Sequence, residues 1–162
     1  MGSVKLLAIL MAATLSATTA TAQTVIVVRH ADRAASDDLI PVGLQRAQDL
    51  KVSLAAAGVT LVITSDTKRA RLTGAPTAQA THAQVTELAD PAAIAAAVRA
   101  APPAATVLVV GHSNTVPKIV QALGGPAVPD LADTCFDAMF VIQLGGSAPK
   151  VVQTRYGAPT AC

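Results

Sequence analysis

Histidine and arginine side chains recur just after three apolar stretches of this 162-residue sequence. Arg29 and His30 follow the first stretch, and Arg69 comes shortly after the second. His112 follows the third. A guanidinium group matches a tetrahedral phosphate by bidentate hydrogen bonding, and a neutral imidazole is nucleophilic near neutral pH. These residue types indicate phosphoryl-group chemistry, with one histidine as nucleophile and the other as a charge-stabilising donor.

The apolar stretches have the composition of buried parallel strands. Residues 24–28, 59–64 and 106–110 are nearly continuous apolar runs rich in β-branched residues, as expected of strands covered on both faces. Two further strands, 137–144 and 150–155, flank a glycine turn. The helices that we expect are residues 44–58, 67–80 and 90–101, and one that Ser113 or Asn114 caps and that ends at Gly124.

This order of elements predicts an α/β fold, a three-layer sandwich with a mostly parallel central sheet flanked by helices and an antiparallel hairpin at one edge. Ligands of such sheets collect at the carboxyl ends of the strands. Arg29, His30 and His112 stand at those ends. A helix beginning at Ser113 would add backbone donors for an anion. We therefore expect the candidate residues to meet at one edge of the sheet.

Three motifs resemble those of the histidine phosphatase (phosphoglycerate mutase-like) superfamily. The first is Arg29-His30-Ala31, where the superfamily has Arg-His-Gly, and the third is the strand that ends in His112. The second, S-x-x-x-R-A-x-x-T, is matched by Ser65, Arg69, Ala70 and Thr73. The motifs follow one another along the whole of residues 23–162. The resemblance is to the small exported branch, and it implies the phosphoglycerate mutase-like sandwich.

The resemblance also implies roles for four of these residues. His30 would be the nucleophile and would carry the phosphoryl group as phosphohistidine. Arg29, Arg69 and His112 would bind that group. Cationic donors of this kind would neutralise the charge of a loose transition state, so we expect no metal and no other cofactor.

The resemblance leaves the general acid open. The branch with acid phosphatase and phytase activity has an Asp directly after the second His, where this chain has Ser113. The mutase-like branch takes a Glu from the segment after the second motif, and the one Glu of the chain, Glu87, stands there. Glu87 is therefore the candidate, with Asp32 and Asp66 in reserve. Arg33 matches a third phosphate-binding arginine of the phytase-like branch.

The segment between the second and third motifs limits the choice of reaction. Its roughly thirty residues are taken up by expected elements, which leaves no lid over the site. An open site favours transfer to water, so the predicted function is hydrolysis of a small phosphorylated substrate. A phosphomutase, or a non-catalytic phosphate-binding protein of the same fold, is the alternative. A nucleophile elbow at residues 111–115 is disfavoured because no His follows Ser113.

Composition excludes several classes of partner. The net charge is +2 and the basic residues are scattered, so no nucleic-acid footprint is present. Aromatic residues make up 2% of the chain, too few for a base-stacking platform. The length fits one domain, residues 23–162. The sequence gives no indication of its oligomeric state.

Residues 1–22 have the pattern of a secretory signal peptide. Lys5 precedes a short apolar stretch, and small residues follow up to Ala22. The apolar stretch is too short to span ~30 Å of hydrocarbon. We therefore expect an exported protein, periplasmic or extracellular, without stable membrane association once the signal is removed.

The chain has two cysteines, Cys135 and Cys162. An even number of cysteines after an export signal favours their pairing in a disulfide. If residues 137–144 and 150–155 pair about Gly146, Cys135 lies opposite residues near position 158, and a short tail brings Cys162 within reach. We expect a disulfide that is structural and separate from the phosphate-binding elements.

Overall fold

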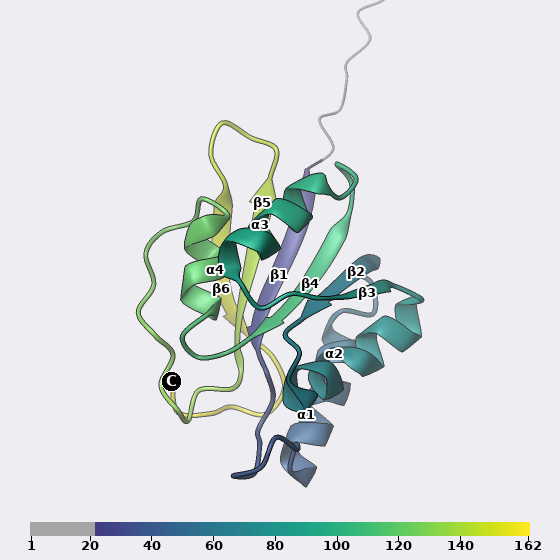
Figure 1. The fold of residues 1–162 in the computed structure, drawn as a ribbon, viewed down its shortest axis with the longest axis vertical. Helices are drawn as coiled ribbons and strands as arrows, with labels where there is room; N and C mark the ends of the chain where they lie inside the picture. The colour runs from purple at the N-terminus through teal and green to yellow at the C-terminus, as the bar shows by residue number, and fades with distance from the viewer. Residues whose placement is uncertain (1–21) are drawn as a thin grey trace, which may run out of the picture.

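The computed structural model describes residues 22–162, which are built around a six-stranded sheet of order β3-β2-β4-β1-β5-β6 (Figure 1). The strands are β1 (Gln23–Arg29), β2 (Val59–Thr64), β3 (Gln84–Glu87), β4 (Thr106–Gly111), β5 (Ala138–Leu144) and β6 (Lys150–Arg155). The first four pair in parallel, whereas β5 is antiparallel to β1 and β6 to β5. The expected mostly parallel sheet with an antiparallel edge hairpin is confirmed. The expected signal peptide lies outside the described residues, apart from Ala22.

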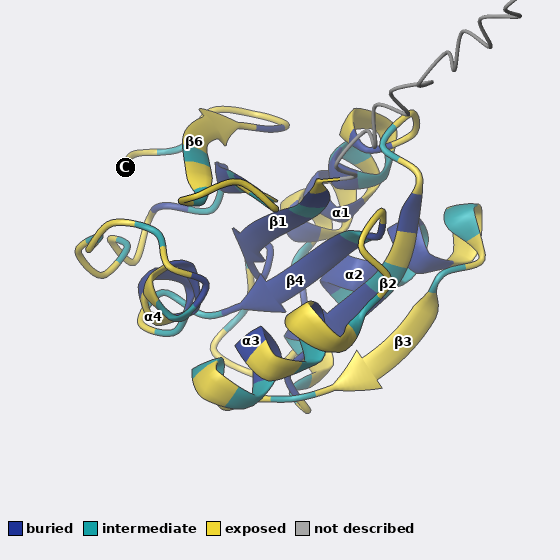
Figure 2. Ribbon diagram, turned by 90° about the horizontal axis from the view of Figure 1, so that it is seen from above, coloured by how far each residue is buried: buried dark blue, intermediate teal, exposed yellow. Residues whose placement is uncertain are grey.

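Helices cover both faces of the sheet, which is why its central strands are apolar throughout. Helices α3 (Pro91–Ala100) and α4 (Val116–Ala122) pack on the face that includes Val25 and Val27. Helices α1 (Pro41–Ser53) and α2 (Lys68–Thr81) pack on the face that includes Ile26 and Val28. Figure 2 shows β1 and β4 buried, whereas the edge strand β3 is exposed. Each buried Val or Ile contributes about 1.5–3 kcal/mol, so the central strands fix the fold.

Side-chain caps and prolines set where most helices begin. Thr67 accepts a hydrogen bond from the backbone of Ala70 at the start of α2, and Asp90 caps α3 ahead of Pro91. Helix α1 begins at Pro41, three residues before the expected start. It ends at Ser53 rather than at residue 58 because residues 54–56 form a turn.

The expected start of α4 was wrong. The helix begins at Val116, so neither Ser113 nor Asn114 caps it. The cause is a local turn: the Thr115 hydroxyl accepts a hydrogen bond from the backbone N–H of His112, and the N–H of Val116 donates to the His112 carbonyl. Residues 113–115 therefore precede the helix, and the expected backbone donors at Ser113 are not those of a helix N-terminus.

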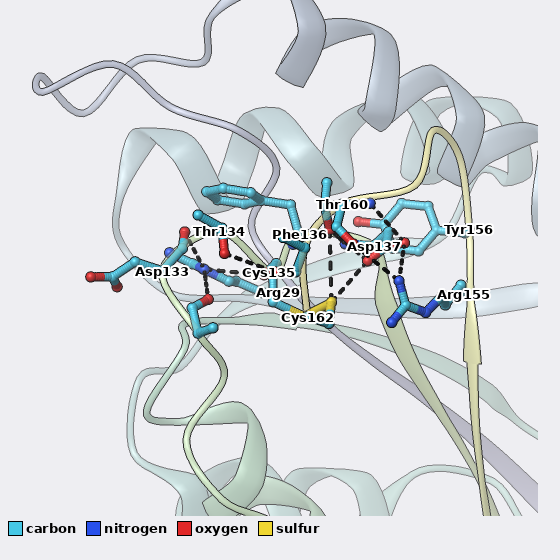
Figure 3. The surroundings of a disulfide bond; sticks show 12 residues. Arg29, Asp133, Thr134, Cys135, Phe136, Asp137, Arg155, Tyr156, Thr160 and Cys162 are labelled. Atoms are coloured by element: carbon cyan, nitrogen blue, oxygen red, sulfur yellow. Dashed lines mark hydrogen bonds and ion pairs between the residues drawn. A yellow bond between two sulfur atoms is a disulfide. The ribbon is translucent and has the colours of Figure 1, made fainter.

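The expected bond between Cys135 and Cys162 is present (Figure 3). It joins the segment before β5 to the tail after β6. The hydroxyl of Thr134 donates to the carbonyl of Ala161 over 2.7 Å, and the backbone of Phe136 donates to the hydroxyl of Thr160 over 3.0 Å. Among residues 22–162, no helix has both the length and the apolar character needed to cross a membrane.

Gly43 in α1 allows the helix to touch the segment that follows β1. A Cβ atom at this position would lie 2.0 Å from the backbone carbonyl oxygen of Asp32. Gly43→Ala should therefore lower the free energy of unfolding by about 1–3 kcal/mol through overpacking, although alanine is the better helix former. Urea denaturation measures the change. Gly146→Ala is the control, since its Cβ would make only an ordinary contact; an equal or higher midpoint for Gly43→Ala would contradict the close contact.

Candidate active site

The parallel pairing of β1 and β4 brings two histidines together. Arg29 is the partner of Gly111 in the register, and the next residues on the two strands are His30 and His112. Their ring centroids are 5.4 Å apart in an edge-on arrangement. Arg69, in the first turn of α2, has its Nη2 3.4 Å from Nδ1 of His112. The structure thus gathers the four side chains at the carboxyl edge of the sheet.

The protonation state of His30 follows from its neighbours. Its Nδ1 lies 2.8 Å from the carbonyl oxygen of Ala31. A carbonyl can only accept, so Nδ1 carries the proton and Nε2 keeps a free lone pair. Burial lowers the pKa of His30 to about 4, and the positive charges of Arg29 and Arg69 act in the same direction. His30 is therefore a neutral imidazole whose Nε2 can attack an electrophile.

His112 is held by a chain of hydrogen bonds. Because its Nδ1 accepts from Arg69, its Nε2 carries the proton and donates to the hydroxyl of Ser65 over 2.9 Å. The Ser65 hydroxyl in turn donates to that of Thr67 over 2.9 Å. Burial lowers the pKa of His112, and the charges of Arg69 and Arg29 lower it further. Ser65 belongs to the second motif, but its role in orienting His112 was not apparent from the sequence.

Arg29 is buried, and one arm of its guanidinium is fixed. Nη1 donates to the carbonyl oxygens of Ala132, Asp133 and Cys135 over 2.9, 3.0 and 3.1 Å. The Arg29 Cζ lies 4.1 Å from the ring centroid of Phe136. Within residues 22–162 the buried Nε has no hydrogen-bond partner. Nε and Nη2 form the edge of a guanidinium that binds an oxyanion bidentately, and this edge is free of the carbonyl contacts.

Arg69 is arranged in a similar way. Its Nη1 forms an ion pair of 2.5 Å with Asp37, and its buried Nε has no partner in the described part of the chain. Asp37 also accepts from the backbone N–H of Lys68 over 2.6 Å, which holds the pKa of its carboxyl group below the usual range. Sequence analysis missed Asp37. The only signal for it is the pair Asp37-Asp38 in the loop before α1, and nothing in that loop indicates that it contacts α2.

Thr73 explains the last position of the second motif. Its hydroxyl accepts from the backbone N–H of Ala31 over 2.9 Å and donates to the carbonyl of Arg69 over 2.8 Å. It therefore joins the segment that follows His30 to the helix that carries Arg69.

The remaining candidates lie outside this cluster. Arg33 is exposed and donates to carbonyls of its own loop, at Ala34 and Ala35. Asp32 accepts from Arg46 over 2.6 Å. Glu87 is half-exposed, 3.5 Å from Nη1 of Arg71, and Asp66 is exposed. Among the described residues, no hydrogen bond joins any of these three carboxylates to His30 or His112.

In residues 22–162, one group of potential metal ligands lies close together: Cys135, Asp137 and Cys162. Both sulfur atoms belong to the disulfide, so neither is a thiolate that could bind a metal ion.

Solved structures from several organisms share this architecture over nearly their whole length. A protein of Nakamurella multipartitia that is assigned as the phosphohistidine phosphatase SixA is 24% identical, with a TM-score of 0.63 over 85% of this chain and 98% of its own. A protein of Agrobacterium tumefaciens with the same assignment is 19% identical, with a TM-score of 0.62 over 83% and 97%. Phosphoglycerate mutase of Plasmodium falciparum is 18% identical, with a TM-score of 0.58 over 88% and 94%. The chain has the histidine phosphatase fold. No protein-family model and no curated protein sequence matches it.

Within this histidine phosphatase fold, the cluster combines a neutral nucleophilic nitrogen with two fixed cations. Nε2 of His30 has a free lone pair, and Arg29 and Arg69 each have a buried Nε without a protein acceptor among the described residues. Buried polar atoms are normally hydrogen-bonded. An oxyanion could supply the acceptors that these two donors lack among the described residues.

The low pKa of His30 can be measured directly. In a titration followed by NMR, the imidazole of His30 should protonate with a midpoint of about 4, below the usual 6.5. The ring stays neutral as the pH falls from 7 because burial and the two arginines oppose the charged form. The signal of His30 is assigned by its absence from the spectrum of His30→Ala. A midpoint at the usual value would contradict the buried environment described here.

Proposed function

We propose that the protein is a phosphomonoester hydrolase that acts through a phosphohistidine intermediate on His30. The observation that carries this proposal is the free Nε2 of neutral His30 beside two arginines, each with a buried Nε that has no acceptor among the described residues. A bound phosphate would supply those acceptors, and its charge would be neutralised by the guanidinium groups. The similarity of fold to proteins assigned as phosphatases supports the same conclusion.

The reaction has two steps. Nε2 of His30 attacks phosphorus, and the bond from phosphorus to the ester oxygen breaks as the alcohol leaves with a proton. Water then attacks the phosphohistidine, which releases inorganic phosphate and restores His30. Arg29 and Arg69 bind the oxygens that become equatorial. These cations supply the charge stabilisation that a metal provides elsewhere, so we propose that the reaction is independent of metal ions.

His112 completes the phosphate site by changing its protonation state. The charges of Arg69 and Arg29 contribute to its low pKa, and a phosphate dianion would offset them. His112 then takes up a proton, so that Nε2 still donates to Ser65 while Nδ1 donates to a phosphate oxygen in place of its contact with Arg69. His112 thus donates a charge-assisted hydrogen bond to the phosphate only once the substrate is bound.

We propose Glu87 as the general acid that protonates the leaving oxygen. Glu87 ends β3 and is the register partner of Thr64 on β2, one residue before Ser65. It thus stands at the same edge of the sheet as the histidines, and its half-exposed carboxyl can exchange protons with water. Asp32 is less suited because both of its carboxylate oxygens already accept hydrogen bonds from Arg46. Asp66 is the second candidate for the general acid, and Arg33 is a further candidate for binding the phosphate.

The substrate that we propose is small and phosphorylated. The segment from Thr73 to Thr106 is used by α2, β3 and α3, so it contributes no lid, and an open site favours water over a second alcohol as acceptor. Phosphohistidine belongs in the substrate panel because two proteins of the same fold are assigned as phosphohistidine phosphatases. We also propose that the protein is exported, with residues 1–22 as the signal.

Removal of the nucleophile tests the mechanism. His30→Ala should lower kcat/KM for p-nitrophenyl phosphate by at least about a hundredfold, because the covalent step is lost. Rapid quenching of the wild-type reaction with labelled substrate should trap an acid-labile, base-stable adduct. Both assays contain a chelator, since no metal is proposed. Residual activity above about a tenth in His30→Ala would exclude the mechanism. Saturable binding of phosphate without release of nitrophenol would identify a non-catalytic binder instead.

The general acid is tested through the leaving group. Glu87→Gln should slow hydrolysis of alkyl phosphates by about 10²–10⁴-fold and change that of p-nitrophenyl phosphate far less, because nitrophenolate hardly needs protonation. Steady-state kinetics on both substrates measure the difference. Asp66→Asn is the matched control and should leave the ratio of the two rates unchanged. If Glu87→Gln lowers the rates on both substrates equally, a group other than Glu87 is the general acid.

A further inference from the structure

The orientation of Arg29 depends on one loop, residues 131–136, which we name the Arg29 loop. Three of its carbonyl oxygens accept from Nη1, and the ring of Phe136 lies against the guanidinium (Figure 3). Nη1 has two hydrogen atoms for three acceptors, so the plane of the guanidinium is set by where these carbonyls lie. The direction of the Nε and Nη2 edge is thereby set as well.

The Arg29 loop is itself held at both ends. At its start, the backbone N–H of Leu131 donates to the carbonyl of Ser113 over 3.0 Å, next to His112. At its end, the C-terminal tail lies alongside: Thr134 bonds to Ala161, and Cys135 is linked covalently to Cys162. The loop has no regular secondary structure. Its position therefore rests on these attachments, on the bond from the backbone of Phe136 to Thr160, and on the packing of Leu131 and Cys135 against the core.

Asp137 anchors the tail beneath the loop. Burial opposes its ionisation, but hydrogen bonds from Thr160 and the charge of Arg155 outweigh it and hold the pKa of the carboxyl below its usual range. The carboxylate accepts from the hydroxyl of Thr160 over 2.6 Å and from Arg155 over 3.0 Å. It also lies 3.0 Å from Sγ of Cys162. Asp137 thus fixes the tail, and the disulfide connects that fixed tail to the Arg29 loop.

We propose that the Cys135–Cys162 disulfide is a positioning element of the phosphate site, acting through the Arg29 loop on Arg29. The proposal rests on the phosphatase function proposed above. It replaces the expectation that the bond is remote from the phosphate-binding elements, because the carbonyl of Cys135 itself bonds to Arg29. Without the bond, the carbonyls lose a fixed support and the guanidinium loses its defined plane. A misplaced guanidinium would bind the phosphoryl group less tightly in the ground state and in the transition state alike, which raises KM and leaves kcat nearly unchanged.

The test compares the oxidised wild type with Cys162→Ser, in the full chain. We expect the KM for p-nitrophenyl phosphate and the inhibition constant of inorganic phosphate to rise by about tenfold, and kcat to change by less than about twofold, since Arg29 binds the phosphoryl group in the ground state as well. Val59→Ala is the control for stability. It removes core volume at the opposite end of the sheet and should lower the melting temperature without changing KM.

A second measurement does not depend on folding of the variant. Dithiothreitol supplies two electrons and two protons, converts the disulfide of the folded wild type to two thiols and becomes a cyclic disulfide. Reduced wild type should show the same rise in KM, and reoxidation should reverse it. In an Arg29→Lys background, Cys162→Ser should change KM by less than about twofold, because a lysine makes no planar contact with the three carbonyls.

The outcomes separate this proposal from the proposed function. An oxidised wild type that hydrolyses substrate, together with unchanged KM after reduction and in Cys162→Ser, would show a purely structural bond and overturn the proposal. Equal effects of Cys162→Ser in the wild-type and Arg29→Lys backgrounds would overturn it too. If the oxidised wild type neither binds phosphate nor turns over substrate, the proposed function itself fails.

Discussion

The parallel pairing of β1 with β4 is the constraint on which the rest of the site depends. The backbone N–H of His30 donates to the carbonyl of Gly111 over 2.8 Å, one residue beyond the paired strands. This bond places two residues that are far apart in sequence at the same edge of the sheet. Helices on both faces keep the two strands dry, so their register is fixed by apolar packing on each side. A shift by one residue would turn His30 away from His112.

Electrostatics at this edge follow from burial combined with an excess of positive charge. Arg29 and Arg69 approach two histidines whose pKa values are both lowered, and among the described residues the single carboxylate bonded to either arginine is that of Asp37. Such a site opposes protonation of its own imidazoles and favours an anion from solution. The same charges therefore keep the nucleophile active and attract the group it would attack.

The sequence was sufficient for the parts of the molecule that depend on residue type. Runs of β-branched residues located the central strands to within one or two residues, and the motifs selected four residues, Arg29, His30, Arg69 and His112, that lie together in the structure. Parts that depend on backbone position could not be predicted. A turn closed by the hydroxyl of Thr115 moves the start of α4 to Val116. The contact of Arg29 with Cys135 spans 106 residues and uses a carbonyl, which every residue type possesses.

The attachment of the tail to the Arg29 loop has a consequence for the order of assembly. Arg29 ends the first strand in chain order, whereas Cys162 follows the last. During synthesis, the sheet and its helices can therefore be complete before Arg29 acquires its covalently supported surroundings. If the disulfide positions Arg29 as proposed, the surroundings of Arg29 are completed by oxidation of two sulfur atoms, a chemical step distinct from packing of the core.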